Sequence, residues 1–162
     1  MYFQELDNFL TKQEFLPIKE FFTGNFMPWY YNKHQTKGDT SFFSHRFYWD
    51  NKIETYQDMW QIITPIINKL KASKILRVKA NLTINKGLSD YCNYHVDSSE
   101  EHMVAVYYIT TCNGFTSLGV EDKIKIKCKE NKMVIFDGKI KHSVVSQTDE
   151  DQRIVININF IK

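Results

Sequence analysis

The chain has 162 residues, of which 43% are hydrophobic and 15% aromatic, so it can build the core of one compact domain, expected to span residues 1–162. This composition excludes an intrinsically disordered protein. Twenty-one Lys and Arg residues against nineteen Asp and Glu residues leave a formal charge of +2, which is too balanced to indicate a nucleic acid or an anionic membrane as a necessary partner.

The apolar runs, the first ten residues and the cysteines of the chain indicate the cellular compartment in which the protein works. No apolar run reaches the roughly 18 residues that would span a bilayer, and the start, MYFQELDNFL, has acids where a signal peptide has basic residues. Cys92, Cys112 and Cys128 are odd in number and lack C-x-x-C spacing. We therefore expect a soluble cytoplasmic protein with free thiols that take no part in its function, and no membrane partner.

The first helical signal begins near residue 11. Thr11 followed by Glu14 is a capping-box pattern, which predicts a helix that starts here and ends at Gly24. Pro17 indicates that the regular part of this helix is short.

A second helix is predicted over residues 56–70, where apolar side chains recur at three- and four-residue spacing behind Thr55 as the N-cap. The aromatic-rich segment 42–49 lies between the two helices and predicts a strand. Together these elements form the expected helical support region, residues 1–74.

From residue 75 to residue 162 the hydrophobic pattern has a period of two, which is typical of strands. One strand is predicted over residues 75–84, with one apolar and one polar face. Lys alternates with apolar residues in the segment 123–128, which is typical of an edge strand kept soluble by charge. Turn signals separate the further predicted strands, at residues 103–111, 123–128, 132–136, 141–146 and 153–161. We expect a mainly β fold, a jelly roll with an N-terminal helical layer packed on one sheet.

Four residues of this β half carry a chemical pattern. His95 and Asp97 form a His-x-Asp step, which by itself could equally be a salt bridge in a loop. His142 opens one predicted strand, and Arg153 opens the last one. Considered alone, Arg153 would be expected to form a structural salt bridge.

The last predicted strand has two different faces. Arg153, Asn157 and Asn159 share one face, and the opposite face is uniformly apolar. Because the apolar face is expected to be buried, the polar face is expected to line a cavity.

Two imidazoles and one carboxylate on one side of a metal suit non-haem Fe(II) and leave coordination positions open. A 2-oxo acid can occupy two of these positions through its keto oxygen and carboxylate, and dioxygen a third. The planar guanidinium of Arg153 suits bidentate pairing with a distal carboxylate. Zinc is an alternative metal for the same ligands.

The order of a His-x-Asp step, a distal His and an Arg resembles the 2-oxoglutarate- and Fe(II)-dependent oxygenases. The stretches 28–31, 77–82 and 153–160 also resemble a group of small oxygenases encoded by marine bacteriophages, and the similarity runs over nearly the whole chain. The resemblance implies a double-stranded β-helix fold of the cupin-like type. It also implies a phage-encoded enzyme that works in the cytoplasm of a bacterial host.

The same resemblance implies roles for single residues. His95, Asp97 and His142 would bind iron as the catalytic centre, and Arg153 would hold the distal carboxylate of 2-oxoglutarate. Tyr107-Tyr108 matches a Tyr-Tyr step of prolyl hydroxylases, so Tyr108 would hydrogen-bond this cosubstrate.

Residues outside this pattern have weaker implications. Asn81 and Thr83, on the polar face of the strand before the metal motif, are further cosubstrate candidates, and Asn159 lies where prolyl hydroxylases usually carry Trp. Residues 29–31, Trp-Tyr-Tyr, either line a substrate mouth or pack between layers. His34, His45 and His102 lack an acid at the right spacing and are expected to be surface or core-edge histidines.

The expected function is a dioxygenase that uses Fe(II), 2-oxoglutarate and O2, with ascorbate in a supporting role, to hydroxylate an unactivated carbon and release succinate and CO2. The wider resemblance favours a peptidyl residue such as proline as substrate, and a nucleobase or a small molecule such as a free amino acid stays open. The rival class is a non-enzymatic jelly roll, such as a sugar-binding or virion structural module. The sequence does not indicate an oligomeric state.

Overall fold

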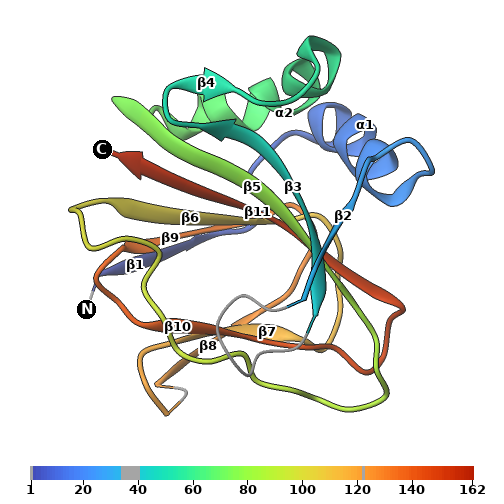
Figure 1. Cartoon of the computed structure of the whole chain (residues 1–162), viewed down its shortest axis with the longest axis vertical. Coiled ribbons are helices and arrows are strands. Elements are labelled where there is room, and N and C mark those ends of the chain that lie inside the picture. Colours follow the sequence, from blue (N-terminus) through green and yellow to red (C-terminus); the bar gives the residue numbers. More distant parts are fainter. Residues whose placement is uncertain (1, 34–40, 122) are drawn as a thin grey trace.

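The computed structural model describes residues 2–33, 41–121 and 123–162, and their strands form two antiparallel sheets, one large and one small (Figure 1). The large sheet contains, in spatial order, β1 (Phe3–Leu6), β9 (Lys132–Asp137), β6 (Met103–Tyr108), β11 (Gln152–Ile161), β5 (Lys74–Ile84), β3 (Phe42–Trp49) and β2 (Tyr30–Asn32), with β4 (Lys52–Ile53) paired to β3. The small sheet contains β10 (His142–Val145), β7 (Phe115–Leu118) and β8 (Ile124–Lys127). This is the mainly β jelly-roll architecture predicted from the sequence.

Helix α1 (Lys12–Thr23) begins with the predicted capping box. The Glu14 amide donates to the Thr11 hydroxyl, the Glu14 carboxylate accepts from the Thr11 amide, and Gly24 is the C-cap. The expectation that Pro17 keeps the helix short was wrong, because the helix continues for twelve residues with Pro17 inside it. The buried residues Phe15, Ile18 and Phe22 anchor the helix to the core on both sides of the proline and offset the one backbone bond it removes.

Helix α2 (Gln57–Leu70) starts one residue later than predicted, and its N-cap is Tyr56. Thr55 does not cap the helix because its hydroxyl is hydrogen-bonded to His45 Nε2 at 2.8 Å. In Figure 1 both helices lie on the face of the large sheet that points away from the small sheet. Within the described residues, neither helix is both long and apolar enough to cross a bilayer.

Two apolar clusters fill the layers on either side of the large sheet. One cluster packs the helices against the apolar faces of β5 and β11, and the other lies between the two sheets. Because side chains of a strand alternate, the polar residues of β5 and β11 point from the large sheet toward the small one. The polar face predicted to line a cavity thus lies inside the jelly roll.

The predicted strands near residues 75, 103, 124, 132, 142 and 153 are all present, and β8 is an edge strand of the small sheet as its lysine pattern indicated. Four short strands were not predicted, namely β1, β2, β4 and β7. Residues 1–74 contribute the two helices and also β1 to β4 of the large sheet.

Candidate metal centre and cosubstrate site

Two polypeptide segments bring the three proposed metal ligands together. His95 and Asp97 lie in the long connection between β5 and β6, and His142 is the first residue of β10. His95 and His142 form an isolated antiparallel bridge, with backbone hydrogen bonds of 3.0 and 2.9 Å in the two directions. This bridge fixes the irregular connection to the small sheet, so both imidazoles are presented from a paired backbone.

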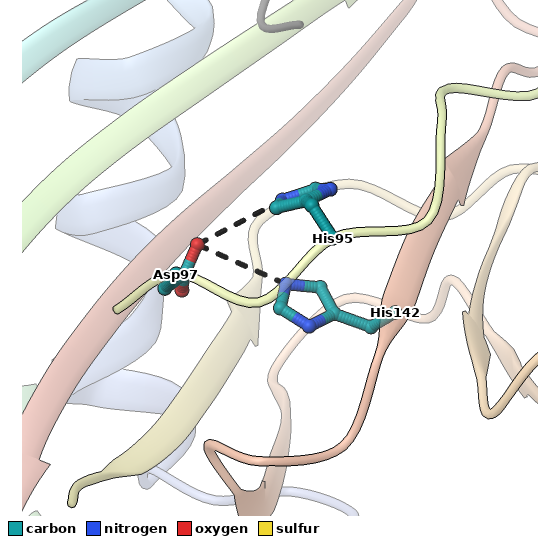
Figure 2. A group of neighbouring side chains, drawn as sticks. All are labelled: His95, Asp97 and His142. Atoms are coloured by element: carbon teal, nitrogen blue, oxygen red, sulfur yellow. Dashed lines mark ion pairs between the residues drawn. The ribbon is translucent and has the colours of Figure 1, made fainter. Parts of the chain in front are cut away.

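The three side chains point toward one another (Figure 2). Asp97 Oδ1 is 3.8 Å from His95 Nε2 and 3.9 Å from His142 Nε2, and one ligand atom from each residue lies within 4.8 Å of the others. Two ligands bonded at about 2 Å to one ion lie no more than about 4 Å apart, so the two distances to Asp97 fit a common ion. The donor set therefore fits a divalent transition metal.

The second ring nitrogen of each histidine, Nδ1, contacts a backbone carbonyl. Nδ1 of His95 lies 3.0 Å from the Asn93 carbonyl, and Nδ1 of His142 lies 3.2 Å from the Ile140 carbonyl. Because a carbonyl only accepts, each Nδ1 carries the proton and each Nε2 directs its lone pair toward Asp97. Backbone contacts of this kind orient metal-binding histidines.

The second oxygen of Asp97 is held by three donors. Asp97 Oδ2 accepts hydrogen bonds from Asn159 Nδ2 at 2.9 Å and Asn157 Nδ2 at 3.2 Å, and it pairs with Arg77 Nη2 at 3.0 Å. The carboxylate thus presents Oδ1 to the imidazoles while Oδ2 is fixed from behind. The two asparagines lie on the predicted cavity face, whereas the role of Arg77 was not found from the sequence.

Electrostatic interactions and burial favour the protonation states of Asp97 and His142 that a metal requires. Burial alone would raise the pKa of Asp97, but Arg77, His142 and the Asn159 hydrogen bond together hold it well below its usual range. Burial lowers the pKa of His142, against the opposing effect of Asp97. Near neutral pH the carboxylate is therefore ionised and His142 is neutral.

Arg153 lies inside the jelly roll with 2% of its surface exposed. Its Nη2 donates to the Thr116 hydroxyl at 3.1 Å, and its guanidinium lies 5.6 Å from the Tyr108 ring centre. Tyr108 also donates to Thr116, at 2.7 Å. In the described part of the chain Arg153 has no carboxylate partner, and its Nε is buried without a hydrogen bond, so the alternative of a structural salt bridge finds no partner.

A thiol also approaches this arginine. Hydrogen bonds from Cys112 and Arg153 lower the pKa of Cys128 against the effect of burial. The three cysteines are free thiols, as expected.

Buried polar atoms lie between the metal ligands and Arg153. Arg153 and Asn157 are four residues apart on β11, which is about 13 Å along a strand. Asn81 lies opposite Val155 between them, and the side-chain oxygens of Asn81 and Asn157 are buried without a partner in the described residues. Unsatisfied atoms of this kind indicate a place for a polar ligand.

Thr83, the other cosubstrate candidate, already has hydrogen-bond partners within the protein. The Thr83 hydroxyl is directed to Gln147 Oε1 at 3.3 Å and to the Arg153 carbonyl at 3.5 Å. Asn81 is therefore better placed than Thr83 to contact a ligand.

His45 and His102 do not belong to the group of proposed ligands. His45 is buried and bonds to Pro28 and Thr55, and His102 is buried beside the Glu100 carbonyl. His34 lies outside the described residues.

For residues 29–31 the two alternatives were a substrate mouth and packing between layers, and each applies to a different residue. Trp29 packs against the core near Phe22, whereas Tyr30 is exposed and lines a cavity. Tyr31 is exposed on the edge strand β2 and contacts Phe43.

Comparison with known proteins identifies the fold. No protein-family model and no curated protein sequence matches the chain. Solved structures do match. An oxidoreductase of the 2OG-Fe(II) oxygenase family from Burkholderia pseudomallei aligns with a TM-score of 0.76 at 10% sequence identity, over 98% of this chain and 84% of that one.

Two further structures agree. A prolyl-4-hydroxylase from Pseudomonas putida has a TM-score of 0.68 at 11% identity, over 99% of this chain and 92% of that one. The epimerase SnoN in complex with Fe3+, alpha ketoglutarate and nogalamycin RO has a TM-score of 0.67 at 10% identity, over 99% of this chain and 78% of that one. The chain thus has the fold of the 2-oxoglutarate- and Fe(II)-dependent oxygenases, as the sequence resemblance implied.

Proposed function

We propose that the protein is a 2-oxoglutarate- and Fe(II)-dependent dioxygenase. In this reaction 2-oxoglutarate and O2 are converted to succinate and CO2, and a carbon of a second substrate is hydroxylated. One observation carries the proposal: Asp97 Oδ1 faces Nε2 of both His95 and His142, inside the fold that these oxygenases share. Ascorbate would support the reaction by keeping the iron reduced.

The ligand set would be His95, Asp97 and His142. When bound there, ferrous iron supplies open coordination positions at which a 2-oxo acid and dioxygen react. His95 and His142 contribute neutral imidazoles, whose Nδ1 protons are held by backbone carbonyls. Asp97 contributes the charge, and Arg77, Asn157 and Asn159 hold its other oxygen.

Arg153 would bind the distal carboxylate of 2-oxoglutarate. Its guanidinium is buried and lacks an acidic partner among the described residues, so the carboxylate would supply the missing charge. Tyr108 and Thr116 fix the position of the guanidinium from one side. Asn81, with its unpaired buried oxygen, would orient the middle of the cosubstrate.

The first experiment tests the class of reaction without knowledge of the substrate. Protein loaded anaerobically with Fe(II) and 2-oxoglutarate is exposed to O2, and succinate is measured by mass spectrometry. Slow succinate formation is expected from the wild type and not from His142→Ala. The control is Asn68→Ala, which changes an exposed side chain of helix α2.

The outcome can also decide against an oxygenase. If protein shown to hold both iron and 2-oxoglutarate forms no succinate above a metal-free control, the non-enzymatic jelly roll is the better interpretation. Tight binding of Zn(II) together with failure to bind Fe(II) would favour the zinc alternative.

For the second substrate we propose a peptidyl residue, with proline favoured. The similarity to the P. putida prolyl-4-hydroxylase supports this choice. The test is a bacterial lysate incubated with enzyme, Fe(II), ascorbate and 2-oxoglutarate, in which peptides are searched for the mass of one added oxygen atom. Nucleosides or free amino acids that gain this mass, with no gain in peptides, would replace the peptide assignment. A bacterial lysate is used because the resemblance implies a phage-encoded enzyme that works in the cytoplasm of a bacterial host.

A further inference from the structure

A cavity of about 560 Å3 lies on the polar face of strands β2, β3 and β5. It is lined by Tyr30, Asn32, Ser44, His45, Arg46, Trp49, Glu54, Arg77 and Lys79. Arg77 connects this cavity to the centre, because the same side chain pairs with Asp97 at 3.0 Å. Arg77 and Asp97 also line a second cavity. A molecule in the first cavity therefore lies one side chain away from the metal site.

The charges on the cavity wall do not cancel. Arg46 pairs with Glu54 at 2.6 Å, and Arg77 pairs with Asp97. Lys79 is the third cation, and in the described part of the chain it has no acidic partner. Its ammonium lies 4.9 Å from the Phe42 ring centre.

The position of Lys79 raises the energy of its charged form. Burial, followed by the nearby Arg77, lowers the pKa of Lys79, and Asp97 opposes this effect only in part. An anion next to the ammonium would relieve both the lost hydration and the repulsion. The wall is therefore organised for a ligand with negative charge.

We propose that the substrate of this site is an anion whose carboxylate or phosphate group binds Lys79, between Arg46 and Arg77. The assignment of this anion as the substrate rests on the proposed oxygenase function, whereas the anion site itself does not. The cosubstrate has a different cation, because Arg153 pairs with Thr83 in strand register, four residues along β5 from Lys79. The aromatic walls formed by Tyr30 and Trp49 would contact the uncharged part of the same ligand.

The anion site is tested on metal-free protein with inorganic phosphate as the probe. The indole N–H signal of Trp49, assigned with Trp49→Phe, reports binding in a nuclear magnetic resonance titration. Phosphate should shift this signal in the wild type, and Lys79→Gln should weaken the binding about tenfold or more, as expected for loss of one charge-assisted hydrogen bond. Lys12→Gln makes the same change of net charge on exposed helix α1 and should leave the affinity unchanged.

Two results would overturn the site. Equal phosphate affinity in the wild type and Lys79→Gln would remove Lys79 from it. If 2-oxoglutarate alone displaces phosphate and so reverses the shift of the Trp49 signal, the cosubstrate itself uses this cavity. Neither measurement depends on turnover, so failure of the anion site is distinguishable from failure of the oxygenase.

The link to the substrate is tested with the loaded enzyme. A bacterial lysate is separated on an anion exchanger, and each fraction is assayed for faster succinate formation. Stimulation is expected in the retained, anionic fraction, and stimulation confined to the unretained fraction would contradict the proposal. Treatment of the active fraction with a phosphatase then separates the two sources of charge, because loss of stimulation indicates a phosphate and persistence indicates a carboxylate.

Discussion

Asn159 donates a hydrogen bond of 2.9 Å to Asp97 Oδ2, and this contact joins β11, the last strand of the chain, to the irregular connection that carries two proposed metal ligands. Asn157, two residues away on the same face of β11, contacts the same oxygen at 3.2 Å. The polar face of one regular strand thereby sets the orientation of a carboxylate that lies in a loop. Precise presentation of Asp97 Oδ1 follows from rigid β-structure and not from the loop itself.

Asn159→Leu should therefore weaken metal binding while the overall fold is retained. Loss of a residue that orients a metal ligand typically costs about 10- to 100-fold in affinity. Anaerobic calorimetric titration with Fe(II) or Mn(II) measures the effect. The control is Asn68→Leu, the same change on the exposed face of α2. Equal metal affinities for Asn159→Leu and the wild type would show that Arg77 and Asn157 are sufficient to position Asp97.

Asp97→Ala should abolish metal binding and turnover, because it removes the anionic ligand from the set. Its circular dichroism spectrum should remain that of the wild type, since the apolar clusters do not include Asp97. The free energy of unfolding should fall by about 1 to 3 kcal/mol, as Arg77, Asn157 and Asn159 lose their shared acceptor. A variant without cooperative unfolding in urea would instead indicate that the main role of Asp97 is structural.

Much of this fold could be predicted because its long strands have clear patterns. The alternation in β5 and β11 identified both a buried face and a cavity face. Strand β7 was not predicted, because its four residues, Phe115–Leu118, show no alternation and form a strand only through pairing with β10 and β8. Its contribution matters to the site, since Thr116 of β7 contacts Arg153.

The proposed metal ligands could be predicted because their residue types and their order along the chain are typical of a metal site. His95, Asp97 and His142 were identified from residue type and order, and the structure brings them together. Arg77 was assigned only to a polar face, because its pairing with Asp97 depends on the path of the irregular segment 85–102. No local pattern specifies such a path, since it depends on the bridge between His95 and His142.

Arg153→Leu should weaken the binding of 2-oxoglutarate far more than the binding of iron. Truncation leaves a buried carboxylate without a charged partner, which costs about 2 to 5 kcal/mol, or roughly 30-fold to several thousand-fold in affinity. Arg153→Lys should lose less, because it keeps the charge and loses only the bidentate geometry. The measurement is a titration of 2-oxoglutarate into iron-loaded protein under anaerobic conditions, followed by the weak visible band of the complex. If the wild type and Arg153→Leu bind the cosubstrate equally, another cation holds its distal carboxylate.

The stability of the metal-free protein should depend on pH through two buried histidines. Burial lowers the pKa of His45 and of His142 below the ordinary value of 6.5. Above that value both folded and unfolded chains hold neutral imidazoles, so these groups add no pH dependence. Below it the unfolded chain binds protons that the folded chain does not, and the free energy of unfolding therefore falls as the pH is lowered through and below 6.5.

Urea unfolding at a series of pH values between about 7.5 and 5.5, above the range in which ordinary carboxylates titrate, isolates this effect. His45→Gln retains a polar side chain for Pro28 and Thr55 but cannot titrate in this range, so its free energy of unfolding should depend less steeply on pH than that of the wild type. His142→Ala should reduce the slope in the same window, and the double variant should reduce it further because the two residues contact different partners. Slopes that remain at the wild-type value in both single variants would mean that neither imidazole is held neutral by the fold. In that case the protonation state assigned to His142 as a metal ligand would also have to be revised.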